Sequence, residues 1–248
     1  MHKMSKVIFA LVLLTCISGT AIAQFKDLLN KAENTIGGGK GNGGGGLSEA
    51  DISSGLREAL NVGAKNAIAR VSVQDGFFGD ALIKVLMPPE TRKVENTMRE
   101  VGFGKQVDEA VLSMNRAAED ASTKALDIFI DAIRGMSIQD ALSILKGNND
   151  AATQYLKAKT TAALTEAFRP VIQASLDKVG ATKYWATVFS TYNELPTTFK
   201  KVNPDLPAYV TERALNGVFV YIASEEGKIR KDPAAQVTDL LKKVFGSH

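Results

Sequence analysis

Cysteine and histidine are almost missing from this sequence. The one cysteine, Cys16, stands in an N-terminal apolar run, and the two histidines, His2 and His248, stand at the ends of the chain. Disulfides, thiol nucleophiles and thiolate metal sites are therefore excluded from the body of the protein. The lack of an internal histidine excludes Ser-His-Asp triads, imidazole zinc sites and Glu-x-x-His di-iron sites. We expect no metal and no cofactor.

An excess of charge of one sign is also missing. Two of the 30 Lys and Arg residues lie within residues 1–23, so 28 basic residues face 27 acidic ones in the remaining 225 positions. No dense basic stripe interrupts this balance. A general nucleic-acid binder needs surplus positive charge to neutralise phosphates, so we do not expect a nucleic-acid partner.

The longest apolar run is too short to cross a membrane. It covers residues 7–16, follows two lysines and precedes Ala21-Ile22-Ala23, which has the small-x-small pattern of a cleavage site. A span needs about 20 residues. We therefore expect residues 1–23 to be a signal peptide, with an exported, periplasmic protein beginning at Gln24. The alternative is a lipid anchor on Cys16, although Thr15 fits the lipid-attachment box poorly.

The next two segments differ sharply in composition. Residues 24–36 place apolar side chains at helical spacing, which predicts a short amphipathic helix. Residues 37–46 contain eight glycines, which is typical of a flexible linker. Lys40 is followed by glycine rather than by Ser or Thr, so this tract does not match a phosphate-binding loop. We expect residues 47–248 to form a single helical domain.

Alternation with a period of two, the pattern of strands, is almost absent from residues 47–248, and helix signals dominate. Ser48 with Asp51 and Ser137 with Asp140 form capping boxes. Gly104–Arg134 carries the clearest apolar stripe and predicts one long helix. The predicted helices cover residues 48–71, 89–101, 104–134, 137–147, 150–168 with a kink or restart at Pro170, 182–192, 207–228 and 232–245. The predicted fold is all-α, an irregular bundle of about eight helices behind the N-terminal helix and its tether.

Several blocks of the domain resemble an uncharacterised bacterial family, the domain of unknown function 4197. The resemblance covers roughly Leu47 to Gly246, and its blocks are residues 55–60 (GLREAL), 75–77 (DGF), 115–119 (NRAAE), 151–155 (AATQY), 225–226 (EE), 229–233 (IRKDP) and 244–246 (VFG). It implies an exported helical protein, often with a signal peptide or a lipid anchor. It implies no established activity.

One candidate site lies on the Gly104–Arg134 segment. Asn115 and Glu119 are four residues apart and share a helix face, and Arg116 can reach Glu119 along the same surface. The functional hypothesis is a polar binding site between helices, with Glu119 as an acid, a base or a cation ligand. The alternative is a hydrogen-bonded network that fixes helix register.

A second candidate site lies on the C-terminal long helix. Glu226 and Arg230 form a pair with i,i+4 spacing, as expected at a helix surface. Glu225 falls on the apolar stripe, so we expect it to point inward and to need a partner, for which Arg57 or Arg116 is available. This group is either a catalytic carboxylate site or an internal salt bridge.

Aromatic side chains supply the remaining candidates. Tyr155, Tyr184 and Trp185 are candidate binding residues, and Phe77-Phe78 lies in a turn. These rings form either an apolar pocket or docking surface, or part of the core.

These observations predict a non-enzymatic envelope protein that binds an apolar ligand, such as a lipid, or another envelope protein. The alternative is a hydrolase or lyase acting on envelope polymers with Glu119 and Glu225 as its carboxylates. A water-accessible pocket holding both carboxylates would favour the enzyme, whereas buried carboxylates paired with arginines would favour binding. The sequence does not predict the oligomeric state.

Overall fold

The computed structural model of the chain describes residues 48–194, 201–202 and 205–231. All of them belong to the unit Leu47–His248. The predicted signal peptide (1–23), amphipathic helix (24–36), glycine-rich linker (37–46) and last helix (232–245) lie outside the described residues.

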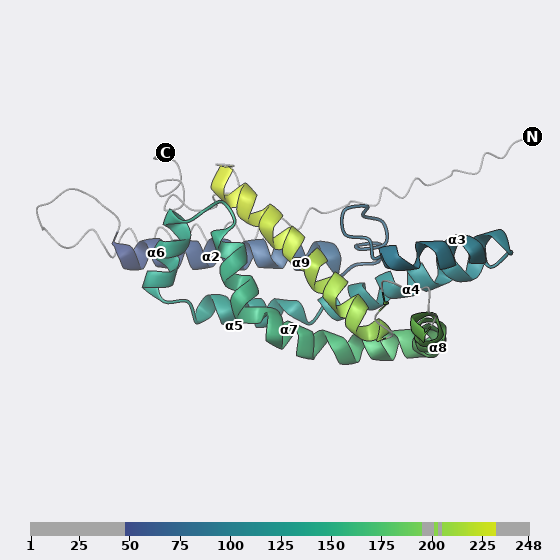
Figure 1. The fold of residues 1–248 in the computed structure, drawn as a ribbon. Helices are drawn as coiled ribbons and strands as arrows, with labels where there is room; N and C mark the ends of the chain where they lie inside the picture. Colours follow the sequence, from purple (N-terminus) through teal and green to yellow (C-terminus); the bar gives the residue numbers. More distant parts are fainter. Residues whose placement is uncertain (1–47, 195–200, 203–204, 232–248) are drawn as a thin grey trace, which may run out of the picture. The chain divides into compact units, whose positions relative to one another are not determined.

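Every regular element in the described residues is helical, which confirms the all-α prediction (Figure 1). The elements are α2 Glu49–Val71, the 3₁₀ turn η1 Pro89–Thr91, α3 Arg92–Glu100, α4 Gly104–Ser122, α5 Ala125–Arg134, α6 Ile138–Lys146, α7 Ala151–Lys178, α8 Ala181–Glu194 and α9 Leu206–Lys231. Over the same part of the chain, no helix combines the length and the apolar character that crossing a bilayer requires.

The two predicted capping boxes are present. Ser48 Oγ accepts a hydrogen bond from the backbone N–H of Asp51 at 3.2 Å and starts α2. Ser137 Oγ accepts from the N–H of Asp140 at 3.0 Å and starts α6. Each Asp side chain binds back to the serine, so donors at the helix start are satisfied within four residues.

The prediction of one long helix over Gly104–Arg134 is wrong, because Thr123 and Lys124 separate α4 from α5. The hydroxyls of Ser122 and Thr123 bind carbonyls of their own helix, and the Lys124 N–H bonds three residues back instead of four. Ser and Thr side chains that bind nearby backbone groups compete with helix propagation. The helix ends there and restarts at Ala125.

The break also changes which side chains face the core. Continuing the α4 stripe into α5 would bury Ile128 and Ala132. In the structure Phe129 and Ile133 are fully buried, whereas Ile128 and Ala132 are only partly so. The restart therefore turns the buried face of α5 by one residue, because the interrupted helix no longer keeps the rotational phase of α4.

Pro170 does not restart the helix, as the sequence had suggested it could. Helix α7 runs without interruption through this position, where the proline faces solvent. Proline inside a helix costs about 3 kcal/mol. Phe168 and Ile172, on either side of it, are fully buried. We attribute the continuity of α7 to this packing.

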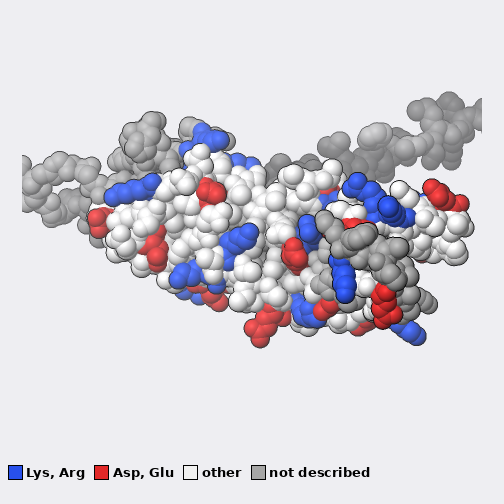
Figure 2. Space-filling view, viewed as in Figure 1, with Lys and Arg blue, Asp and Glu red and all other residues white. Residues whose placement is uncertain are grey.

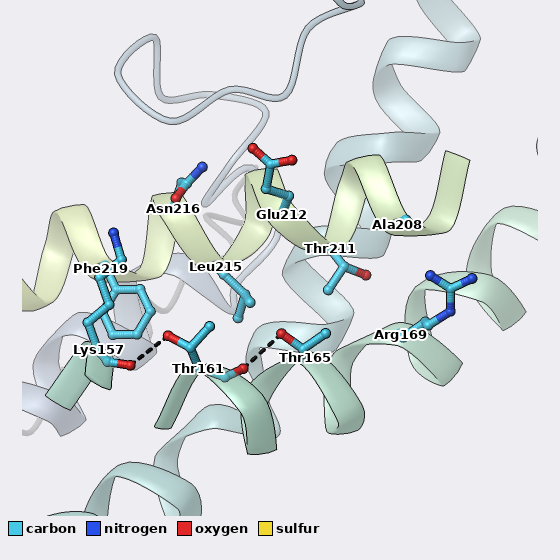
Figure 3. Close-up of a pocket in the computed structure, with 10 residues that line it drawn as sticks. All are labelled: Lys157, Thr161, Thr165, Arg169, Ala208, Thr211, Glu212, Leu215, Asn216 and Phe219. Carbon is cyan, nitrogen blue, oxygen red and sulfur yellow. Dashed lines mark hydrogen bonds between the residues drawn. The ribbon is translucent and has the colours of Figure 1, made fainter. Parts of the chain in front are cut away.

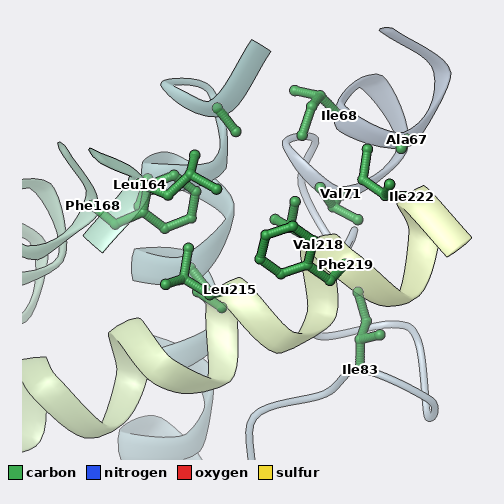
Figure 4. Close-up of a cluster of buried hydrophobic side chains, with 14 of the residues drawn as sticks. Ala67, Ile68, Val71, Ile83, Leu164, Phe168, Leu215, Val218, Phe219 and Ile222 are labelled. Atoms are coloured by element: carbon green, nitrogen blue, oxygen red, sulfur yellow. The ribbon is translucent and has the colours of Figure 1, made fainter. Parts of the chain in front are cut away.

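The long helices α7 and α9 form the centre of the domain. Helix α9 packs on α7, α2 and α4, while α7 also contacts α5 and α8 (Figure 1). Figure 4 shows the apolar side chains of α2, α7, α9 and the segment 72–88 meeting in one cluster. Phe77 is completely buried against Gly217, where an added Cβ would lie only 2.4 Å from the Phe77 ring. Glycine at this position lets the 72–88 segment lie directly on α9.

Candidate functional site

Asn115 fixes an extended segment to α4. Its side-chain oxygen accepts from the Val85 N–H at 2.8 Å, and its amide nitrogen donates to the Val85 carbonyl at 2.8 Å and to the Val111 carbonyl at 2.7 Å. Asn115 is fully buried. The amide thus satisfies the backbone of a segment that belongs to neither a helix nor a sheet.

Glu119 holds the preceding turn in the same way. One carboxylate oxygen accepts from the N–H groups of Phe77 and Phe78 at 3.0 and 3.1 Å, and the other accepts from Arg116 at 2.7 Å. Arg116 also binds Asp75 at 2.7 Å. Glu119 is 3% exposed. Its oxygens are occupied by protein donors, so Asn115, Arg116 and Glu119 act together as a clamp on residues 75–85.

Glu226 is a buried helix cap rather than the surface residue that its spacing predicts. It is 3% exposed and accepts from the N–H groups of Ala152 and Thr153 at 3.0 and 2.8 Å. These are the first backbone donors of α7, which have no partner within their own helix. Arg230 pairs with Glu226 at 2.9 Å and binds the Ile144 carbonyl. A carboxylate at this end is also favoured by the helix dipole.

Glu225 points inward as predicted, but its partners differ from the predicted arginines. It accepts from the Asn66 side chain at 3.1 Å and pairs with Lys228 on its own helix. Its Cβ lies close to Gly63 of α2. Arg57 instead donates to the Met136 carbonyl. Among the residues that the structure describes, Glu119 and Glu225 share no hydrogen-bonding partner, and neither lines the groove described below.

The aromatic candidates lie in different environments. Trp185 is buried and stacks on Tyr209, with ring centroids 6.0 Å apart. Tyr155 is half-buried, and burial raises the pKa of its hydroxyl above the ordinary value. The side chain of Tyr184 lies outside the described residues. Of the aromatic candidates, the structure brings Phe77 and Phe78 to Glu119 through their backbone N–H groups, and the Arg116 guanidinium lies 5.8 Å from the centre of the Phe78 ring.

Asp80 forms a further tie between the 72–88 segment and the helices. It accepts hydrogen bonds from the Tyr221 hydroxyl of α9 and from the Leu82 N–H, and it pairs with Arg70 of α2 at 3.2 Å. The Tyr221 hydrogen bond, followed by those from Leu82 and Arg70, holds the pKa of Asp80 below its usual value. This carboxylate is therefore stabilised in its charged form.

A groove with mainly apolar walls lies among the described residues. It lies between α7 and α9 and has a volume of about 230 Å³ (Figure 3). Helix α7 contributes Lys157, Thr161, Thr165 and Arg169, and helix α9 contributes Ala208, Thr211, Glu212, Leu215, Asn216 and Phe219. The α7 residues recur at every fourth position and so form one row along the helix.

The threonines that line the groove contribute apolar surface, although threonine is a polar residue. The hydroxyls of Thr161, Thr165 and Thr211 each donate to a carbonyl of their own helix at 2.6 to 2.8 Å. These hydroxyl protons are therefore not available to a ligand, and the threonine methyl groups form part of the groove wall. Leu215 and Phe219 project between the helices in Figure 3. The groove thus offers apolar surface with charged side chains near its ends.

The face drawn in Figure 2 shows no concentration of charge of one sign. Figure 2 shows basic and acidic side chains interspersed on the visible face. A second hollow, at the end of α2, is lined by charges of both signs, Arg70 together with Asp75 and Asp80. Within the described ranges, no group of three or more His, Cys, Asp or Glu side chains could hold a metal ion.

A family comparison covers both the clamp and the groove. A family described as Protein of unknown function (DUF4197) matches residues 46–246. The chain belongs to this family. The match confirms the resemblance seen in the sequence blocks, and the family's description specifies no activity. No curated protein and no solved structure matches the chain.

The sequence interpretation missed the groove. It did not single out the row that runs from Lys157 through Thr161 and Thr165 to Arg169. The spacing of four was available as a signal. The spacing could not show the opposing wall of the groove, because that wall comes from α9, some fifty positions further along the chain.

Proposed function

We propose that this chain is a non-enzymatic binding module of the cell envelope that holds an apolar ligand, or apolar side chains of a partner, in the groove between α7 and α9. The observation that carries the proposal is an open groove whose threonine hydroxyls donate their protons to carbonyls of their own helices. Open apolar surface of this kind gains free energy when an apolar group covers it.

The size of the groove supports a small occupant. A volume of about 230 Å³ corresponds to about eight groups of the size of a water molecule, each taking up about 30 Å³. Pockets for drug-sized ligands usually have about 300–1,000 Å³. The groove therefore suits a short acyl chain or one or two apolar side chains, rather than a complete lipid.

The carboxylates give the enzymatic alternative less support. Glu119 accepts two backbone N–H groups and an arginine, and Glu225 accepts an amide and a lysine. A general acid or base must reach a substrate proton directly or through one water. Neither carboxylate lines the groove, so a substrate in the groove would meet neither of them.

Titration with a neutral apolar dye, N-phenyl-1-naphthylamine, tests the proposal. The full chain is expected to bind one dye molecule with increased fluorescence. The double substitution Thr161→Glu and Thr165→Glu places two charges in the groove, and we expect it to lower dye affinity at least about tenfold, since an apolar dye bound there would displace water from both carboxylates. Both positions are exposed, so the core is not altered.

A matched control is available on the same helix. Ala158→Glu with Ala162→Glu has the same spacing and charge, both positions are exposed, and neither lines the groove. We expect this variant to bind the dye like the unmodified chain. Absence of dye binding, or equal loss in both variants, would contradict the proposed function.

The envelope location is tested separately. N-terminal sequencing of the protein recovered from its own cells is expected to begin at Gln24, after the small-x-small pattern at residues 21–23. Fatty-acid labelling that depends on Cys16 would show a lipid anchor instead. Retention of the uncleaved chain in the cytoplasm would contradict export.

A further inference from the structure

We infer that the groove between α7 and α9 selects a monocarboxylate with a short alkyl chain, bound with its carboxylate at Lys157. This inference rests on the proposed function, since it names the chemical class that the groove would take. Three observations support it: the pairing of the two cations in the groove, the order of charges along the groove, and the size of the groove.

The two cations that line the groove differ in their pairing. Arg169 forms an ion pair with Asp205 at 2.5 Å. Lys157 forms no ion pair with any described residue, and its ammonium lies 6.0 Å from the centre of the Phe219 ring. An ammonium beside apolar surface gains from an incoming anion more than a guanidinium that already holds a carboxylate. Lys157 is therefore the cation with capacity for a ligand.

The order of charges along the groove also favours the Lys157 end as the position of the carboxylate. Helices α7 and α9 run antiparallel here, because Arg169 meets Asp205 whereas Lys157 meets Phe219. Glu212 belongs to the groove lining between these two contacts, and Figure 3 shows its carboxylate pointing away from α7. At the far end Asp205 already compensates the charge of Arg169, and beside the middle of the groove Glu212 pairs with Arg213 at 3.6 Å. Only the Lys157 end combines positive charge with apolar wall.

The dimensions of the groove set the length of the chain. From Lys157 to Thr165 the row on α7 advances eight residues, which is about 12 Å at a rise of 1.5 Å per residue. The volume of about 230 Å³ holds about eight groups of methylene size. A carboxylate with about eight carbons would therefore reach from Lys157 along Leu215 and Phe219 to the level of Thr165.

Octanoate and 1-octanol are the matched probes, because they share the chain and differ in the charge of the end group. Binding of each to the full chain is measured by calorimetric titration at pH 7. We expect octanoate to bind more tightly than octanol. Lys157→Met keeps a long, flexible side chain but removes its charge. We expect it to lower octanoate affinity about two- to fivefold, which is the contribution expected of an exposed ion pair.

Lys159→Met is the control for this substitution. Lys159 lies two residues further along α7, over the Tyr155 ring, and it does not line the groove. We expect it to leave the affinities for both probes unchanged. We also expect Lys157→Met to leave octanol affinity within about twofold, because the neutral end group makes no ion pair.

The outcomes separate this inference from the proposed function. If both probes bind but Lys157→Met weakens them equally, or weakens neither, the inference is overturned and the proposed function stands. The inference is likewise overturned, and the function retained, if the groove accepts the dye and an apolar peptide but not octanoate. If octanoate, octanol and the dye all fail to bind, both are overturned.

Discussion

The buried carboxylates and the groove use polar side chains in opposite ways. Glu119 and Glu226 have their oxygens occupied by backbone N–H groups and arginines, and both are almost inaccessible to solvent. The groove residues Thr161 and Thr165 also satisfy their hydroxyls internally, yet they remain exposed and offer methyl groups. Polar residues between helices therefore do not by themselves indicate a site. What matters is whether surface remains open after their hydrogen bonds are made.

The two buried carboxylates also differ from each other. The Arg230 partner of Glu226 has a side chain only 10% exposed, whereas the Arg116 partner of Glu119 is 33% exposed. Water can therefore solvate the Arg116 guanidinium in part if the charge of Glu119 is removed. Loss of a charged partner costs more when the remaining charge stays buried. We therefore expect the Glu226–Arg230 pair to contribute more to stability than the Glu119–Arg116 pair.

Removing the charge of Glu226 is expected to have the largest effect. Glu226→Gln would direct an amide N–H group toward donors in either orientation and would remove the negative charge that faces Arg230 across 2.9 Å. We expect it to lower the free energy of unfolding by about 3–5 kcal/mol. Glu119→Gln should cost about 1–3 kcal/mol. Urea unfolding followed by circular dichroism measures both.

Glu166→Gln is the matched control for these two variants, because Glu166 is exposed on α7. It should change stability by no more than about 0.5 kcal/mol. A smaller loss for Glu226→Gln than for Glu119→Gln would contradict the conclusion that the carboxylate with the more deeply buried arginine partner contributes more.

A methyl group at Gly217 is expected to have the second largest effect. Its Cβ would lie 2.4 Å from a Phe77 ring atom, so the ring that the Glu119 clamp holds in place would have to move. We expect Gly217→Ala to destabilise by about 1–3 kcal/mol, the usual cost of overpacking. Thermal unfolding followed by circular dichroism tests this expectation.

Two further variants sharpen this measurement. Gly227→Ala lies on the same helix with nothing within 4 Å of the added methyl, so helix propensity should make it stabilising by up to about 1 kcal/mol. Phe77→Leu combined with Gly217→Ala should cost less than the sum of the two single changes, because the residues touch. Strict additivity would show that the two sites do not interact.

The Asp80 tie should give a smaller, pH-dependent effect. Because its folded-state pKa lies below the unfolded value, the unfolded chain binds more protons in this range. The stability from Asp80 is therefore present above about pH 4 and lost as the pH falls through the folded-state pKa. Asp80→Asn should flatten the decline of the free energy of unfolding between pH 5 and pH 2 by about 1 kcal/mol or less, as measured by urea unfolding at each pH. An unchanged pH profile would show that Asp80 contributes no linkage.

Changes in the groove should have the smallest effect on stability. Thr161→Glu and Thr165→Glu each replace an exposed side chain on a helix, so we expect each to alter the free energy of unfolding by no more than about 0.5 kcal/mol. Urea unfolding of the double variant used in the dye experiment measures their combined effect. A loss above about 2 kcal/mol would mean that the groove is packed interior rather than open surface.

The sequence by itself determined most of the helices in the described residues. The capping boxes at Ser48 and Ser137 lie within three residues of their partners, and the positive-φ Gly180 follows the end of α7. Such signals involve neighbouring residues only, so they can be read without knowledge of the rest of the chain. The break at Thr123 was missed although its hydrogen bonds are local, because the apolar stripe was followed across it.

Only the tertiary structure decided what the polar residues do. The spacing of Glu226 and Arg230 predicted a surface pair, but α9 meets the start of α7, 73 and 74 positions away, and that contact buries the carboxylate as a cap. The groove likewise needs the row on α7 and the opposing row on α9, which no local pattern brings together. Helix formation depends on interactions within about four residues, whereas burial and surface shape depend on which helices pack against one another.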